Sequence, residues 1–186
     1  MEKVGAAMTL TRSFQISTPL LPLLATSLCV FSLTTSSYAK DNAAIFGFEI
    51  HYGDQFPGAP QKKADEENRL RMVTERLREH FKESGFDVTD IESVAGKAAA
   101  VKLEACSACA SDLARDLGAD MAVTGTVSKV SELVLSMNVK VYDAATAAPL
   151  TSAVVDMRGN TDESWRRAID YLYKHLLSGR LEKIRK

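Results

Sequence analysis

The stretch Asp120–Tyr142, DMAVTGTVSKVSELVLSMNVKVY, predicts two strands joined by a short connection. We expect the first strand at Asp120–Lys129 and the second at Glu132–Tyr142, because β-branched residues are frequent in both. In the second strand apolar residues alternate with mostly polar ones, so one face is apolar and the other mostly meets water. The apolar face consists of Leu133, Leu135, Met137, Val139 and Val141. This pair predicts a hairpin whose apolar face is covered by other elements.

The sequence on either side predicts helices that alternate with further strands. Gly53–Lys63 is rich in glycine and proline and predicts a loop, whereas alanine-rich Ser93–Leu103 fits either a helical turn or a loop. Because each predicted helix has one apolar stripe that needs a sheet face to cover, the fold class is α/β (α+β), a mixed β-sheet with helices packed on it. The predicted order is β-α-β-α-β-β-β-α: Ala43–Tyr52, Asp65–Ser84, Phe86–Ile91, Cys106–Leu117, Asp120–Lys129, Glu132–Tyr142, Leu150–Met157 and Asp162–Ser178.

Residues 1–39 have the pattern of a secretory signal peptide. Lys3 and Arg12 form a positive segment, Leu20–Leu33 is an apolar run, and Ser37-Tyr38-Ala39 supplies small residues at the cleavage positions. We expect cleavage after Ala39. The apolar run is shorter than the roughly 18 residues of a spanning helix, and an uncleaved anchor is the alternative.

Cleavage leaves residues 40–186 as a single α/β domain with a basic helical tail at 179–186, periplasmic or secreted. Translation from Met8 instead of Met1 gives a signal of conventional length, so both starts stay open. Leu28 directly before Cys29 fits a bacterial lipoprotein processing site poorly. We therefore expect no stable membrane insertion after signal cleavage.

The composition is that of an ordinary globular protein. Hydrophobic residues make up 46% of the chain, charged residues 25% and aromatic residues 7%, and the formal net charge is -1 at pH 7. These values exclude a collagen, a low-complexity polymer, a multi-span membrane protein and a strongly basic nucleic-acid-binding protein. We expect no nucleic-acid partner.

Cys106 and Cys109 are the disulfide candidates, because an exported chain meets an oxidising compartment. Their place at a predicted helix N-terminus also stabilises a thiolate, which favours thiol-disulfide exchange. A thioredoxin-like enzyme carries such a motif directly after a buried strand, and Ala98–Ala105 makes a poor strand. A structural disulfide, exchange activity, two unbonded thiols and part of a metal site stay open as alternatives.

We predict no metal site, no cofactor and no catalytic residue. His51, His80 and His175 fall on three different predicted elements, and none forms a short-spaced pair with another His or Cys. We expect His80 and His175 in solvent near helix C-termini, where a cation interacts favourably with the helix dipole. The sequence contains neither a nucleotide-binding glycine loop nor a G-x-S-x-G turn.

The segment RGNTDESW joins the last predicted strand to the closing helix. We expect Asn160 to cap the helix with Glu163 at the third helical position, and Trp165 to pack into the core. Arg158 and Asp162 are left as binding candidates, because an arginine beside free helix amides can hold a carboxylate or a phosphate. The alternative is an Arg-Asp pair at the surface.

The stretch Leu113–Val130, LARDLGADMAVTGTVSKV, resembles the helix-strand unit of the TolB amino-terminal domain and of related bacterial envelope lipoproteins. Together with RGNTDESW it also resembles an uncharacterised family of small exported proteobacterial proteins, labelled as a domain of unknown function. The resemblance implies a TolB amino-terminal-domain-like α/β fold that works by contact with other macromolecules. The chain carries no propeller repeats and no lipid-bearing cysteine, so neither TolB's transport role nor an outer-membrane anchor carries over.

These observations predict a non-enzymatic periplasmic or secreted protein-interaction module of the bacterial cell envelope. We expect its sheet and exposed strand edges to contact an envelope protein. The alternative is a periplasmic thiol-disulfide redox protein that uses Cys106 and Cys109. The identity of the partner and the oligomeric state stay open.

Overall fold

The computed structural model describes residues 41–53 and 64–185. The predicted signal peptide at 1–39 and nearly all of the predicted loop Gly53–Lys63 lie outside the described residues. Within the described part of the chain, no helix has the length and apolar character needed to cross a membrane.

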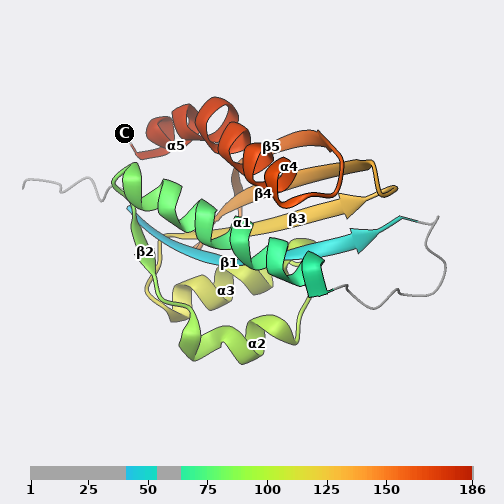
Figure 1. Ribbon diagram of the computed structural model, residues 1–186. Helices are drawn as coiled ribbons and strands as arrows, with labels where there is room; N and C mark the ends of the chain where they lie inside the picture. The colour runs from blue at the N-terminus through green and yellow to red at the C-terminus, as the bar shows by residue number, and fades with distance from the viewer. Residues whose placement is uncertain (1–40, 54–63, 186) are drawn as a thin grey trace, which may run out of the picture. The chain divides into compact units, whose positions relative to one another are not determined.

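The centre of the fold is a five-stranded mixed sheet in the order β2-β1-β3-β4-β5 (Figure 1). β1 runs parallel to both of its neighbours, whereas β3, β4 and β5 form an antiparallel meander. The predicted mixed sheet and the predicted order of strands and helices are confirmed. The strands are β1 (Asn42–Tyr52), β2 (Asp87–Thr89), β3 (Met121–Lys129), β4 (Val134–Asp143) and β5 (Pro149–Arg158).

The predicted hairpin is the pair β3 and β4, joined in register with Val127 opposite Met137. The alternation in β4 works as expected, because its apolar side is at most 1% exposed at each position: Leu135, Met137, Val139 and Val141. Leu133 was expected on the same face, but it precedes the strand and is 69% exposed. The prediction for Leu133 is wrong because the chain is still turning at that residue, so strand alternation does not apply there.

Helices cover both faces of the sheet, as Figure 1 shows. The long helix α1 packs beside the C-terminal helices on one face, here called the α1–α4 face. Shorter helical segments lie on the other, here called the α3 face, and they include the alanine-rich segment that the sequence left undecided. The helical elements are α1 (Ala64–Glu83), η1 (Glu92–Val94), α2 (Ala95–Ala99), η2 (Leu103–Ala105), α3 (Ser107–Asp116), α4 (Asp162–Tyr171), η3 (Leu172–Leu177) and α5 (Ser178–Arg185).

Gly85 directly follows Ser84, the predicted last residue of this helix, and it ends α1. Gly85 has a φ of 80°, a left-handed conformation that glycine adopts without strain. The amide of Phe86 then donates to the carbonyl of Phe81 at 3.0 Å, which satisfies one of the last free carbonyls of the helix.

The closing helix contains a π-helical turn, η3, which changes which leucine faces the sheet. Trp165 is fully buried, so its predicted place in the core is confirmed. Helical spacing from Trp165 through Ile169 and Leu172 predicts that Leu176 is buried as well, but it is only half-buried and Leu177 is buried in its place. The wider turn shifts the apolar stripe by one residue relative to the α-helical spacing on which the prediction rests.

A bulge in β1 decides which side chains reach each face. The pairing of β1 with β3 shifts between Ile45 and Phe48, so that the alternation of side chains changes phase there. Before the bulge, Ala44 packs into the cluster on the α3 face; after it, Phe48 packs into the cluster on the α1–α4 face. Glu49 and His51 therefore lie on the α3 face.

Candidate functional site

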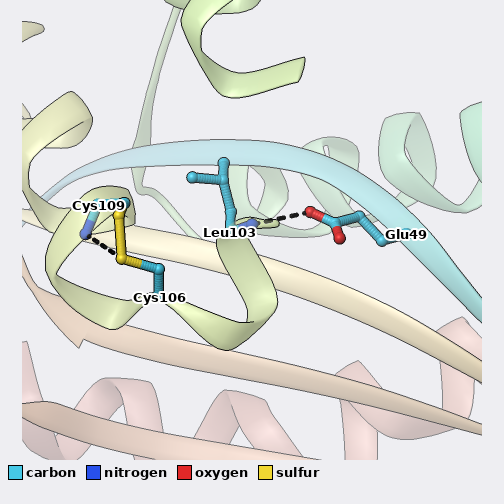
Figure 2. The surroundings of a disulfide bond; sticks show 4 residues. All are labelled: Glu49, Leu103, Cys106 and Cys109. Carbon is cyan, nitrogen blue, oxygen red and sulfur yellow. Dashed lines mark hydrogen bonds between the residues drawn. A yellow bond between two sulfur atoms is a disulfide. The ribbon is translucent and has the colours of Figure 1, made fainter. Parts of the chain in front are cut away.

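A disulfide joins Cys106 to Cys109 at the start of α3, with the two Cα atoms 5.2 Å apart. Cys106 is the N-cap, and its Sγ accepts a hydrogen bond from the amide of Cys109 at 3.2 Å (Figure 2). Both cysteines are half-buried. The helical turn η2 precedes them, so this motif does not follow a buried strand as it does in a thioredoxin-like enzyme.

Next to the disulfide, η2 approaches β1 through carboxylates and an imidazole. The Oε1 atom of Glu49 accepts a hydrogen bond from the amide of Leu103 at 3.0 Å, and Figure 2 shows this carboxylate pointing at η2. The Nε2 atom of His51 lies 2.8 Å from Oε1 of Glu104. The potential ligand atoms of Glu49, His51 and Glu104 all lie within 4.8 Å of one another.

This cluster was not predicted from the sequence, because none of the three histidines forms a short-spaced pair with another His or Cys. A usable signal was present, since Glu49 and His51 are two positions apart on a predicted strand and such residues share a face. Nothing in the sequence pattern indicates that Glu104 meets them, because η2 is reached only after a long excursion of the chain. The structure thus groups His51 with two carboxylates, which is a set of atoms able to hold a metal ion.

A buried ion pair at the other side of the sheet was also missed. Lys129 and Glu66 are each 1% exposed, and Nζ lies 2.6 Å from Oε1. Glu66 also accepts hydrogen bonds from Tyr52 at 2.7 Å and from Asn160 at 3.0 Å. Burial alone raises the pKa of Glu66, but the hydrogen bonds from Lys129, Tyr52 and Asn160 outweigh it and hold the pKa below its ordinary value. The pair ties α1 to the end of β3, which gives it a structural role.

The cap of the closing helix differs from the prediction. Thr161 is the N-cap and forms a capping box with Ser164, so neither Asn160 nor Glu163 has the predicted role. Asn160 lies one residue too early, and its Oδ1 instead accepts a hydrogen bond from Nε1 of Trp165 at 2.9 Å. Threonine and asparagine are both preferred N-cap residues, with asparagine the stronger of the two, so the sequence favoured the wrong one of two adjacent candidates.

The two predicted binding candidates are not brought together. Asp162 pairs with Arg69 of α1, with Nε 2.7 Å from Oδ1. Arg158 forms no ion pair within residues 41–53 and 64–185, and it lines a groove of about 540 Å³ between β5 and α4. The other residues that line the groove are Val155, Asp156, Met157, Ser164, Arg167, Ala168 and Tyr171.

His80 is not in solvent, so the prediction for it is wrong. Its side chain is 2% exposed, its Nε2 lies 2.6 Å from Oδ1 of Asp170, and its ring stacks on Tyr173 with centroids 4.9 Å apart. The prediction failed because α4 packs against α1, and Tyr173 of η3 covers the end of that helix. His175, by contrast, is exposed as expected and contacts the ring of Tyr171.

Comparisons with known proteins give one family and a group of similar folds. A family model described as "Protein of unknown function (DUF2380)" matches residues 41–177, from β1 to the end of η3. Among curated proteins, none matches the chain.

Three solved structures illustrate the similar folds. The LpoB C-terminal domain from Salmonella enterica is 15% identical, with 66% of this chain and 85% of that chain covered and a TM-score of 0.45. Lipoprotein GNA1162 from Neisseria meningitidis is 15% identical, with 66% and 83% covered and a TM-score of 0.45. The PelC dodecamer from Paraburkholderia phytofirmans is 15% identical, with 72% and 86% covered and a TM-score of 0.44.

Proposed function

Since the chain belongs to the DUF3280 family, described as "Protein of unknown function (DUF2380)", we propose its function from its own residues. It acts as a non-enzymatic protein-interaction module of the bacterial cell envelope, periplasmic or secreted. The observation that carries this proposal is β5, a strand of 10 residues at the edge of the sheet. An edge strand has a row of backbone amides and carbonyls on its outer side, which can pair with a strand of a partner.

The surroundings of β5 favour an extended partner segment that carries carboxylates. Val154 of β5 is 54% exposed and Tyr171 of α4 is 52% exposed, so both offer apolar contact. The groove beside the strand is lined by Arg158 and Arg167 against a single carboxylate, that of Asp156. A partner strand that pairs with β5 and directs a carboxylate into the groove satisfies the backbone and Arg158 together, whereas Arg167 already lies 3.8 Å from Glu163.

A lysine on the edge strand tests the pairing. Val154→Lys adds a charge where the side chain is already exposed, so the fold should be retained while strand addition is blocked. Tagged protein is used to capture envelope proteins, which are identified by mass spectrometry, and the recovered partner should be lost from this variant. The matched control is Val101→Lys, at an exposed valine outside β5, which should retain the partner. A partner that binds Val154→Lys unchanged would refute docking at β5.

Charge reversal tests the acidic character of the partner. Arg158→Glu should weaken capture of the partner, because it places a negative charge in the groove that is proposed to bind a carboxylate of the partner. Arg166→Glu is the control, since Arg166 is exposed on the same helix as Arg167 but does not line the groove. Equal losses from both variants would indicate general charge attraction instead of a site at Arg158.

Export is proposed on the signal pattern in residues 1–39. The mature chain then starts at Lys40, and intact-mass measurement of the native exported protein should give the mass of residues 40–186. Recovery of the full-length chain in the membrane fraction would contradict this, and it would favour an uncleaved anchor.

A second candidate function is thiol-disulfide exchange, which the half-buried disulfide at the N-terminus of α3 favours. The reduction potential separates the two functions. A value below about -300 mV marks a structural disulfide, and a value of about -120 to -200 mV marks an exchange-active one. We expect the structural value, because the motif follows η2 and not a buried strand.

A further inference from the structure

We propose that Glu49, His51 and Glu104 bind one Zn²⁺ ion on the α3 face of the sheet. The site joins two elements that are distant in the sequence, β1 and η2. Glu49 and His51 reach this face together because the bulge after Ile45 changes the phase of β1. Glu104 reaches it because the amide of the preceding residue, Leu103, donates to Glu49.

The charges of the cluster favour a cation. Two carboxylates face one imidazole here, and within residues 41–53 and 64–185 neither carboxylate forms an ion pair with a lysine or an arginine. Lys140 approaches η2, but its Nζ donates to the backbone carbonyl of Glu104 at 3.4 Å and leaves the carboxylate with its charge. Glu104 has a side chain only 15% exposed, so water screens this negative charge weakly.

The site is open enough for an ion to enter. The side chain of His51 is 40% exposed. Glu49 and His51 line a cavity of about 600 Å³ between β1 and the segment 98–103. Three protein ligands leave at least one coordination position, which water from this cavity can fill.

The donor atoms select the metal. An imidazole suits Zn²⁺ and other transition metals, whereas Mg²⁺ and Ca²⁺ prefer sites made wholly of oxygen. Ligand atoms at about 2.0–2.1 Å from a tetrahedral Zn²⁺ lie roughly 3.3 Å from one another. Side-chain rotation by Glu104 and His51 closes the present separation, and the hydrogen bond between them gives way to bonds with the ion. The hydrogen bond from Leu103 holds Oε1 of Glu49 and orients its other oxygen for binding.

Isothermal titration of the purified, disulfide-intact protein with ZnCl₂ tests the site. We expect one equivalent of Zn²⁺ to bind, and MgCl₂ to give no binding. Glu49→Gln, His51→Gln and Glu104→Gln should each lower the affinity by about tenfold or more, since each removes a ligand at similar size. Circular dichroism of the metal-free variants should match the parent, which separates loss of a ligand from loss of the fold.

Two controls separate this site from other zinc ligands. His175→Gln removes an exposed histidine elsewhere and should leave the affinity unchanged. The Cys106→Ser, Cys109→Ser variant should still bind one equivalent, which excludes reduced thiols as the ligands. The proposal is overturned if no saturable equivalent binds, if folded His51→Gln binds as tightly as the parent, or if only the cysteine variant loses the metal.

Discussion

The two faces of the sheet are covered in different ways. On the α1–α4 face, large side chains such as Trp165, Phe81 and Leu77 are fully buried under two long helical segments. On the α3 face, short helical segments cover a smaller cluster with Phe46 and many alanines. The α3 face also carries the polar residues of the proposed zinc site. Most apolar burial thus lies on one face, so the other face can carry functional polar groups at little expense to stability.

The largest expected effect breaks the α1–α4 face. Trp165→Ala should lower the free energy of unfolding by about 3–5 kcal/mol, because it opens a cavity. It also removes the hydrogen bond from Nε1 to Asn160. Denaturant unfolding measures this, with Arg158→Ala as the control at under about 1 kcal/mol. A Trp165→Ala protein as stable as the parent would contradict the role of this side chain in the packing of the α1–α4 face.

A somewhat smaller loss is expected from the buried charge on the same face. Lys129→Ala leaves Glu66 buried without its cation and should cost about 3 kcal/mol, the lower end for such pairs. The lower end applies because Glu66 keeps its hydrogen bonds from Tyr52 and Asn160. The double variant Lys129→Met, Glu66→Leu should be more stable than Lys129→Ala in the same unfolding assay. If Lys129→Ala and the double variant were equally stable, the unpaired charge of Glu66 would not be what destabilises Lys129→Ala.

On the α3 face, removal of the disulfide should have a moderate effect. Cys106→Ser, Cys109→Ser should fold and lose about 2 kcal/mol or less, because so short a loop restricts the unfolded chain little. Circular dichroism and unfolding with and without reductant measure this, and the reduced parent should match the variant. If the variant were exported but unfolded, this prediction would be wrong, and the α3 face would be as important for stability as the α1–α4 face.

The smallest effect concerns acid stability. Burial disfavours the charge of Asp170, but hydrogen bonds from Arg76 and His80 outweigh burial and hold its pKa below the ordinary value. Its stabilising contribution is therefore present above the unfolded pKa of about 3.9 and is lost as pH falls through the lower folded pKa.

Asp170→Asn should cost about 1 kcal/mol at pH 7 and flatten the fall in stability below about pH 4. Unfolding curves between pH 2 and 7, a range of about five units, give both quantities. The matched variant on the α3 face is Asp112→Asn, whose exposed pair with Arg115 should contribute about 0.5 kcal/mol or less. The contrast between the two faces would be contradicted if the free energy of unfolding of the two variants changed with pH in the same way.

Most of the fold could be predicted from local patterns, because alternation and helical spacing act over a few residues. The strands β3 and β4 and the helix stop at Gly85 are examples. The π-helical turn was not predictable, since it changes which of Leu176 and Leu177 faces the sheet without changing the composition.

The candidate sites were less predictable, because their members meet only through tertiary packing. His80 meets Asp170 across α1 and α4, although the two residues are far apart in the sequence. Glu49 and His51 could have been paired from their spacing, but Glu104 joins them only through the path of η2. Cys106 and Cys109 were predictable because a bond between such close residues is a local event.

The central place of β1 in the sheet also sets the order in which the chain can fold. β1 is the first strand along the chain, yet Ala43 pairs with Met121 of β3. The hairpins β3-β4 and β4-β5 join neighbouring segments and close small loops, so they form quickly. Most of β1 must wait for β3, because the short β2 pairs only with Asn42–Ala44. Until β3 has emerged from the ribosome or a translocation channel, the apolar segment 45–48 has no strand to pair with. We therefore expect the sheet to close late, and the unpaired part of β1 to be the segment most exposed to premature association between chains.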